Sequence, residues 1–426
     1  MKKKLTFLLH IHPQKVSRAS IRFTYTYGLG GMTLTLILLQ IFTGILLKFV
    51  YIPSPEKAYD SILFLQDKVL FGKYVRNIHH LSGELLIVLA LLHMLRVFFT
   101  EAFHPPVRSS NWIIGICMFL LIMFFNFTGY LMPWDQLSYW AVTVVTNMFS
   151  YIPLIGNSIT VFIRGGQDVT GNTLRNFFTF HTAIIPLTLI ILMIFHFWKI
   201  RKAGGVAPPR VRKEDEKGLI PTVPNLVVKE IAAGLILLAF VFILAIFLNA
   251  PLRERANPAY SPNPVKAPWY FIGIQEMLMH FHPFVGAILI PLFLLGFLFY
   301  LPWLHYPKNN AGFWFSSPKG RKMVIFSVIF AFLLNPLLIV SDEYLIHFNL
   351  WFPSLPSILS EGLFPVLLYG FFFYLYLLSL RKKYDPSTNE TVQAIYAYFL
   401  ITYTVLSLTG LFFRGPGMAL MWPWQI

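Results

Sequence analysis

Cysteine and charge are both scarce in this chain, and their scarcity excludes several classes of protein. The single cysteine, Cys117, lies in an apolar run, so there is no intrachain disulfide, no CxxC zinc site and no CxxCH haem attachment. Charged residues make up only 12% of the 426 residues, whereas hydrophobic residues make up 56%. Soluble domains carry about a quarter charged residues. The composition therefore excludes an ordinary soluble domain.

Long apolar runs are what the chain does contain. Runs of about 20 residues recur along almost its whole length, and each can cross ~30 Å of hydrocarbon as a helix. A spanning helix satisfies its own backbone hydrogen bonds, so the sequence predicts an all-α polytopic membrane protein. An amphipathic stretch at 5–25, with Arg18 and Arg22, predicts an interfacial helix before the first span. Nine spans are expected, near residues 29–50, 78–99, 111–132, 178–200, 229–249, 284–303, 322–340, 362–380 and 392–413.

The net charge of +16 is better explained by membrane topology than by nucleic acid. Basic residues cluster in the connections between spans. With the N-terminus inside, the inside segments hold 23 of the 34 Lys and Arg residues, and the outside segments hold 11. The positive-inside rule therefore favours an N-terminus inside and, with nine spans, a C-terminus outside.

Four histidines stand at matching heights on two of the expected spans. The second span carries His79 and His93, fourteen residues apart, and the fourth carries His181 and His196, fifteen apart. Fourteen residues complete nearly four turns, so each pair lies along about one helix face, with ~21 Å between its levels. A lone intramembrane histidine is more often a packing residue, but two facing histidines at each level are what two stacked bis-histidine haems require. His80 is a competing ligand, although it points ~100° away from His79.

Glycines and arginines on the same spans support this interpretation. Glycine lets a planar group approach the backbone, whereas small residues on membrane helices otherwise serve helix packing. The fourteen-residue period shared with the histidines favours porphyrin clearance. Arg76 and Arg96, at the two ends of the second span, can each reach a haem propionate; the alternative is an arginine that extends to the membrane surface. The two glycine pairs, on the first and third spans, are Gly30 with Gly44 and Gly115 with Gly129.

These residues belong to motifs that resemble cytochrome b of the bc and b–f complexes. The fifteen-residue spacing of the second histidine pair is similar to the b–f type. The resemblance is dense over 20–205, thins over 220–340 and is poor in the last two spans. It implies a four-helix bundle holding two b haems (1–205), an inside connection (206–228) and a C-terminal bundle of about five spans (229–426). The motifs are Arg76-Asn-Ile-His79, His93-Met-Leu-Arg96, Gly129-Tyr-Leu-Met-Pro133-Trp134-Asp135-Gln136, Thr173-Leu174, and His196-Phe-Trp-Lys-Ile-Arg201-Lys202.

The resemblance also implies a function. The chain is expected to be the membrane subunit of a quinol–cytochrome c oxidoreductase that passes electrons from quinol through the two haems and contributes to proton translocation. His79 and His181 would bind the outer haem iron, and His93 and His196 the inner one. A Rieske iron–sulfur protein, a c-type cytochrome, a second copy in a homodimer and membrane lipids are the implied partners, with no nucleic acid. The implied location is a bacterial cytoplasmic (inner) membrane.

The implied quinol site departs from the family at its signature. The family's Pro-Glu-Trp-Tyr appears as Ala-Pro-Trp-Tyr, so the glutamate that would accept a quinol proton is replaced by Pro268. Glu276 is the expected substitute and Tyr270 the second catalytic residue, with His280 as a rival acceptor; Glu276 could also be a carboxylate without a role. The expected quinol site comprises Pro133, Trp134, Tyr139, Ala141, Pro268, Trp269, Tyr270 and Glu276. At the inner quinone site four charged residues are candidates, and the sequence does not distinguish among them: Lys199, Arg201, Lys202 and Asp215.

The chain departs from the family at two further points, and its sequence bears on two alternative functions. Gly28 occupies the position of the cysteine that binds an extra haem in the b–f type, so no covalent haem is expected, and a ninth span exceeds the family's eight. The alternative is a di-haem cytochrome b that anchors a quinone-linked dehydrogenase or reductase without a Rieske partner. That class lacks the second half with its Pro-Trp-Tyr segment. A proton-relaying transporter predicts acidic residues within spans, yet only Glu84 is acidic inside the first four.

Overall fold

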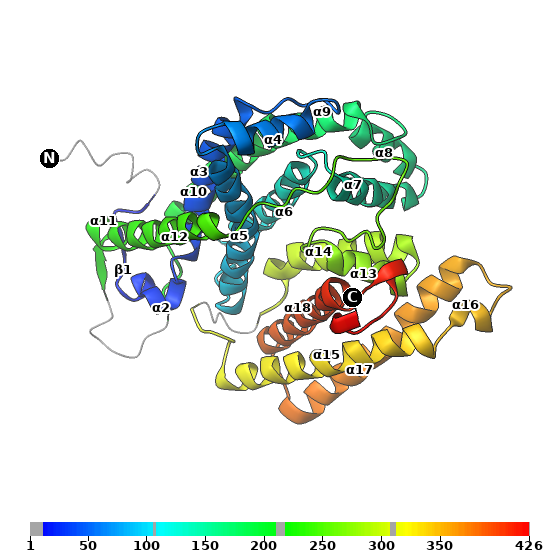
Figure 1. Ribbon diagram of the computed structural model, residues 1–426. Helices are drawn as coiled ribbons and strands as arrows, with labels where there is room; N and C mark the ends of the chain where they lie inside the picture. Colours follow the sequence, from blue (N-terminus) through cyan, green and yellow to red (C-terminus); the bar gives the residue numbers. More distant parts are fainter. Residues whose placement is uncertain (1–11, 105–107, 210–217, 307–311, 426) are drawn as a thin grey trace.

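The computed structural model describes residues 12–104, 108–209, 218–306 and 312–425 (Figure 1). Within these ranges nine helices are long and apolar enough to cross a membrane, which confirms the nine expected spans and the all-α fold class. The first four spans are α3 (Leu29–Lys48), α5 (Gly72–Phe99), α6 (Ser109–Tyr130) and the continuous stretch Gly171–Lys202. That stretch consists of α9 (Gly171–Thr179), the π-helical turn η3 (Phe180–Ile184) and α10 (Ile185–Lys202).

Five further spans follow the polar connection after the fourth span. The fifth packs against α3 and α5, so the N-terminal bundle and the second half share a helix interface. The ninth packs along α15 and against a short helix, α13 (Ile272–His280). The fifth span, Thr222–Phe247, includes α11 (Thr222–Asn225) and α12 (Val227–Phe247). The sixth consists of η5 (Phe284–Leu289), α14 (Ile290–Tyr300) and η6 (Leu301–Trp303), and the seventh is α15 (Pro318–Tyr344). The eighth consists of η7 (Ile358–Leu363) and α17 (Phe364–Tyr384), and the ninth is α18 (Thr388–Phe412).

Short helices lie in the connections. α4 (Ala58–Lys68) packs against α5, and α7 (Gln136–Met148) follows directly after α6 and contacts α8 (Gly156–Arg164). Asp135 caps α7, because its carboxylate accepts from the Ser138 backbone N–H at 2.9 Å. The remaining short elements are α2 (Phe23–Thr26), η2 (Phe149–Tyr151), α16 (Phe348–Trp351), η8 (Pro416–Met418) and η9 (Pro423–Gln425).

The expected interfacial helix over residues 5–25 was wrong for its described part, since residues 5–11 lie outside the described ranges. Strand β1 (Lys15–Ser17) instead pairs antiparallel with β2 (Leu219–Pro221), and the 3-10 turn η1 (Ala19–Ile21) and α2 follow. Val16 lies opposite Ile220 and is buried with Ile21 and Leu226. The segment therefore satisfies its backbone by pairing with a distant part of the chain, which no local periodicity reveals.

Three spans contain the same local feature. A π-helical turn is followed, at the second residue of the α-helix proper, by a proline: Pro186 in α10, Pro291 in α14 and Pro365 in α17. Proline lacks the N–H that would bond to the preceding turn, and its ring clashes with the carbonyl four residues earlier. A wider turn before the proline removes that clash. The spans thus stay continuous through their prolines.

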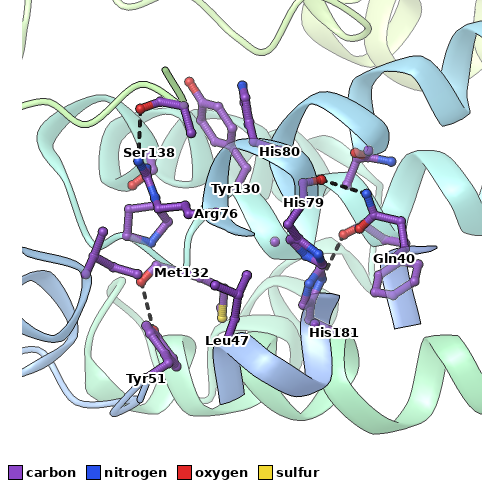
Figure 2. Close-up of a pocket in the computed structure, with 18 of the residues that line it drawn as sticks. Gln40, Leu47, Tyr51, Arg76, His79, His80, Tyr130, Met132, Ser138 and His181 are labelled. Carbon is purple, nitrogen blue, oxygen red and sulfur yellow. Dashed lines mark hydrogen bonds between the residues drawn. The ribbon is translucent and has the colours of Figure 1, made fainter. Parts of the chain in front are cut away.

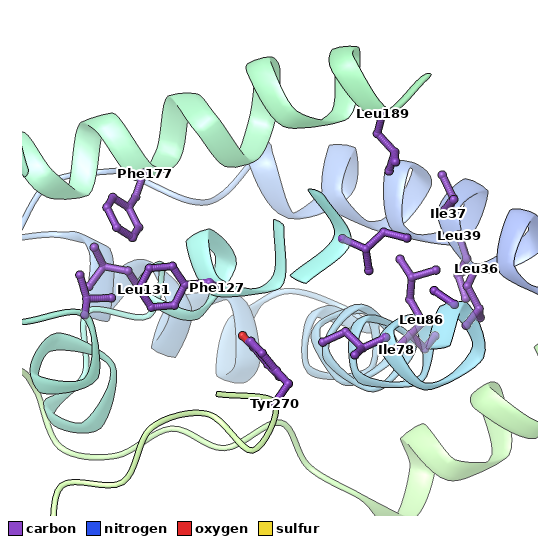
Figure 3. Close-up of a cluster of buried hydrophobic side chains, with 14 of the residues drawn as sticks. Leu36, Ile37, Leu39, Ile78, Leu86, Phe127, Leu131, Phe177, Leu189 and Tyr270 are labelled. Atoms are coloured by element: carbon purple, nitrogen blue, oxygen red, sulfur yellow. The ribbon is translucent and has the colours of Figure 1, made fainter. Parts of the chain in front are cut away.

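The largest buried cluster fills the N-terminal bundle (Figure 3). Leu36 on α3, Leu86 on α5, Phe127 on α6 and Leu189 on α10 contribute to it. Tyr270 joins the same cluster although it lies beyond the fifth span. The connection after the fifth span is therefore held against the four-helix bundle, beside the predicted haem and quinol positions.

Candidate functional site

The four histidines face each other in two pairs. His79 on α5 and His181 in η3 have ring centroids 6.2 Å apart with planes at 79° (Figure 2), and His93 on α5 and His196 on α10 have centroids 6.4 Å apart at 76°. Two metal–nitrogen bonds of about 2 Å each, plus about 1.1 Å from each nitrogen to its ring centre, require roughly 6 Å between rings. Each pair is therefore spaced so that its two imidazoles could hold one metal ion, such as a haem iron, between them.

The π-helical turn explains why the second pair is fifteen residues apart and the first fourteen. On unbroken α-helices the two spacings would orient the partners ~100° differently. Residues 180–184 form a π turn, which holds one residue more than an α turn. The extra residue is absorbed there. His181 and His196 consequently lie on one face of the fourth span, as His79 and His93 do on α5.

Each outer histidine has its Nδ1 engaged. The Thr43 hydroxyl lies 2.8 Å from His79 Nδ1, and His181 Nδ1 donates to the Phe125 carbonyl at 3.0 Å. Histidines that ligate metals almost always have the second ring nitrogen hydrogen-bonded, which fixes the ring orientation and leaves Nε2 for the metal. The outer pair is arranged in this way.

Three of the four predicted glycines lie directly against the histidines. A Cβ at Gly44 would stand 3.3 Å from His79 Cε1, one at Gly30 3.3 Å from His93 Cε1, and one at Gly129 only 2.6 Å from His181 Cε1. A Cβ at Gly115 would meet no atom of the described residues within 4 Å, and this residue lines the inner cavity. Side chains at these positions would push the imidazoles from their places or fill the space beside them.

A cavity of about 130 Å³ beside the inner pair contains polar atoms that lack partners. Arg96 Nη2, Asn111 Oδ1 and His196 Nδ1 are buried and have no hydrogen-bond partner within the described ranges. All three residues line this cavity. Arg96 also lies 4.5 Å from the centre of the Tyr25 ring. A buried guanidinium with an unused donor fits an anionic group such as a haem propionate, so the residues present here fit a haem.

A larger cavity of about 330 Å³ lies beside the outer pair (Figure 2). Arg76 lines it, but its terminal nitrogens donate to Gln66 Oε1 at 2.8 Å, Ala250 O at 2.9 Å and Pro251 O at 2.6 Å. The guanidinium therefore holds the connection after the fifth span. His80 also lines the cavity, but the ring facing His181 is that of His79.

The cytochrome b family (Cytochrome b/b6/petB) matches residues 15–204. Cytochrome b6 of Synechococcus elongatus is 39% identical over 182 residues, which cover 43% of this chain and 84% of that protein. The chain belongs to the cytochrome b family.

One relative and one solved structure of similar fold extend the match into the second half. Cytochrome b/c1 of Bradyrhizobium diazoefficiens is 29% identical over 317 residues, which cover 73% of this chain and 46% of that protein. A solved structure titled "Hyperthermophilic respiratory Complex III" has a TM-score of 0.68 at 24% identity, covering 93% of this chain and 98% of that one. Membership makes the chain an integral membrane subunit of an electron-transport oxidoreductase complex, and it implies b-type haem.

The structure separates the eight residues expected at the quinol site of this cytochrome b. Pro133 and Tyr270 line the outer cavity. The other six do not: Trp134, Tyr139 and Ala141 are buried in the packing, and Pro268, Trp269 and Glu276 lie outside the lining. Trp269 nevertheless reaches the cavity wall, because its indole Nε1–H donates to the carboxylate of Glu84, which does line the cavity.

Glu276, the expected proton acceptor, lies in a buried ion-pair network. Arg414 Nη2 donates to it at 2.8 Å, both side chains are fully buried, and His280 Nε2 lies 3.2 Å away. Burial alone would raise the pKa of Glu276, but the hydrogen bonds from His280 and Arg414 outweigh burial and lower it. His280 in turn contacts Asp342 at 2.7 Å. Burial opposes protonation of His280, yet the two carboxylates raise its pKa.

The inner end of the bundle contains charged residues that the sequence analysis did not select. Glu230, at the start of the fifth span, lies 3.5 Å from His12 Nε2 and packs against the backbone of α3 at Gly31. Its neighbour Lys229 donates to the Ile21 carbonyl at 3.0 Å. The signal available in the sequence was the Lys-Glu pair at the edge of an apolar run. Of the expected inner residues, Lys199 lines the inner cavity, whereas Asp215 lies outside the described residues.

Proposed function

We propose that the chain is the quinol-oxidising subunit of a bc-type complex and holds two non-covalent b haems. His79 and His181 would bind the outer iron, and His93 and His196 the inner one. The observation that carries this proposal is the pair of facing imidazoles at each of two levels, with glycine backbone against them. When bound, the haems supply one-electron transfer between the two faces of the membrane.

The protein's own contribution at the outer face is a mostly apolar cavity with a few polar groups. Tyr270, Tyr130 and Glu84 lie among its lining residues, which suits an amphiphilic quinol with two hydroxyl groups. Arg76 fixes the connection that carries Tyr270, because it binds the carbonyls of Ala250 and Pro251. Tyr403 on α18 adds a second tie, since its hydroxyl donates to the Tyr270 carbonyl at 2.7 Å.

At the inner face Arg96 and Glu230 are the groups we assign. Arg96 would neutralise a propionate of the inner haem through the nitrogen that lacks a partner. Glu230 and His12 would supply protons to a quinone that is reduced near the inner face. This assignment places proton uptake inside and release outside, which is what proton translocation requires.

The partners and location follow from the same proposal. A Rieske iron–sulfur protein and a c-type cytochrome would accept electrons at the outer face, in a homodimeric complex. The complex would lie in a bacterial cytoplasmic membrane. The distribution of basic residues supports an N-terminus on the inner side of that membrane. Against the dehydrogenase-anchor alternative stands the second half of the chain, which a structure titled as a respiratory Complex III matches in fold.

The test is quinol-dependent reduction of a c-type cytochrome by the complex purified through this chain. The expected result is turnover, together with copurification of an iron–sulfur protein that has a Rieske spectrum. Turnover of quinol without any iron–sulfur protein would favour the dehydrogenase anchor. A complex that contains haem but oxidises no quinol would contradict the proposal.

A further inference from the structure

The replacement of the signature glutamate by Pro268 leaves the quinol site in need of a proton acceptor, and the outer cavity offers few candidates. Among the described residues that line it, the carboxylates are Glu84 and Asp135. Both carboxylate oxygens of Asp135 already accept hydrogen bonds from the backbone, one from Ser138 N at 2.9 Å and the other from Arg253 N at 3.0 Å. Glu276 does not line the cavity and is bound by Arg414. Glu84 is the carboxylate that remains.

The surroundings of Glu84 suit a group that exchanges a proton. Its side chain is half-buried on α5, one turn beyond His80. Within the described part of the chain, its hydrogen-bond partner is the indole N–H of Trp269. A single neutral donor leaves the other lone pairs of the carboxylate free for a ligand. Tyr130 and His80 line the same cavity (Figure 2), as does Tyr270, so polar groups surround the place where a quinol head would lie.

The contact with Trp269 also brings a carboxylate to the segment that lacks the family's glutamate. Trp269 directly follows Pro268, the position where the family carries its glutamate. Glu84 reaches this segment from the facing wall, 185 residues away in sequence. A carboxylate is thus present beside the same Trp-Tyr segment, supplied by α5 rather than by the segment itself.

We propose that Glu84 accepts one of the two protons that quinol releases, an inference that rests on the proposed quinol oxidation. One quinol O–H bond breaks and its proton moves to a carboxylate oxygen of Glu84. The second hydroxyl proton passes to water at the outer face. Balance requires that the two electrons leave to two one-electron acceptors and that the product is quinone; His79 and His181 would hold the haem that could serve as one acceptor, and an iron–sulfur protein outside would be the other.

The test compares Glu84→Gln with wild type in the intact complex, using decyl-ubiquinol and dimethyl-naphthoquinol as substrates over a range of pH. Loss of a general base lowers the rate by about 10²-fold, so we expect at least a tenfold decrease. The pH dependence of the remaining activity should flatten, because the titrating group is gone. Glu84→Asp, which keeps the carboxylate, should recover part of the rate and the pH dependence.

Haem spectra and a matched variant separate this role from a structural one. Both haems should keep their reduced spectra in Glu84→Gln and Glu84→Asp. Glu254→Gln, which changes an exposed carboxylate on the same outer connection, should keep the wild-type rate and pH profile. A wild-type rate and pH profile in Glu84→Gln would overturn the assignment while the proposed function stands. Wild-type complex that oxidises neither quinol would overturn both.

Discussion

At the scale of single residues, the ion pair between Glu276 and Arg414 stands out because it is buried away from the histidine pairs. Both side chains are fully buried, and Arg414 contacts Glu343 at 2.8 Å as well. A buried pair contributes modestly to stability when intact, because desolvation offsets the attraction, but breaking it leaves an unpaired buried charge. The pair joins α13 to the end of the ninth span.

We therefore predict that Glu276→Gln destabilises the complex by roughly 3–5 kcal/mol, the usual loss when one partner of a buried pair is removed. Thermal unfolding of the second half, followed by circular dichroism, checks this, with Glu254→Gln as the exposed control. A wild-type unfolding midpoint combined with quinol oxidation slowed at least tenfold would return the role of proton acceptor to Glu276.

His280 makes the stability of the same network depend on pH. Its pKa is raised in the folded state because the carboxylates of Asp342 and Glu276 favour the protonated ring. A raised pKa stabilises the fold below the unfolded value of about 6.5, and that contribution is lost as pH rises through the folded pKa. Between about pH 6 and pH 9, the unfolding midpoint of wild type should fall more than that of His280→Gln. Parallel pH curves for the two proteins would contradict this.

Gly28 carries a prediction about haem attachment. The residue stands at φ +64°, in the left-handed region, and a thioether bond at this position is chemically impossible. Acidified acetone should extract all haem from the isolated subunit. A haem-staining band that persists on a denaturing gel would show a covalent attachment elsewhere in the chain.

What the sequence could predict at this scale depends on how local the signal is. The histidines, the glycines and Arg96 recur at regular intervals along single helices. The sequence therefore predicts that they lie together at two levels, where the structure has two cavities. Glu84 was visible as the acidic residue of the first four spans, but its contact with Trp269 spans 185 residues. Arg414 lies 138 residues from Glu276. No periodic pattern predicts contacts of this kind, so the sequence favours Glu276 as proton acceptor only through its position near the signature.

At the scale of elements, the π-helical turn η3 sets the height and direction of His181. Deleting Ala183 should convert the turn to regular α-helix and leave fourteen residues between His181 and His196, the spacing that α5 already uses. Both haems should then be retained. An alanine inserted after Ile190 instead rotates one histidine by ~100° relative to the other. Spectra of the two variants give the answer: loss of a haem in the deletion, or none in the insertion, would contradict this role for the turn.

The spans themselves were predictable because their signal is composition over about 20 residues. The helices extend beyond the apolar runs, as in Gly72–Phe99 against the expected 78–99, because a helix continues past the hydrocarbon while its residues still pack. The N-terminal strand was missed for the opposite reason. Its partner, Leu219–Pro221, lies about half the chain away, and strand pairing at such separation leaves no periodic trace in either segment.

At the scale of the whole molecule, the two halves are joined at both faces of the membrane. Arg76 and Trp269 link the outer connection to α5. At the opposite end of α5 the buried carboxylate of Glu101 accepts from Asn389 at 2.7 Å, which ties α18 to the N-terminal bundle. The ninth span packs against α13 and α15, and the segment directly after it supplies Arg414. The proposed quinol site draws residues from both halves, whereas both histidine pairs and the glycines against them lie within the N-terminal bundle.

The most direct test of the account is the number of haems per chain in wild type and in His93→Ala, measured by a redox-difference spectrum of the purified complex. We predict two b haems in wild type. Removing one axial ligand of the inner pair should leave one haem, with the spectrum of the site formed by His79 and His181. Two full haems in His93→Ala, or a single haem in wild type, would contradict the pairing of the histidines.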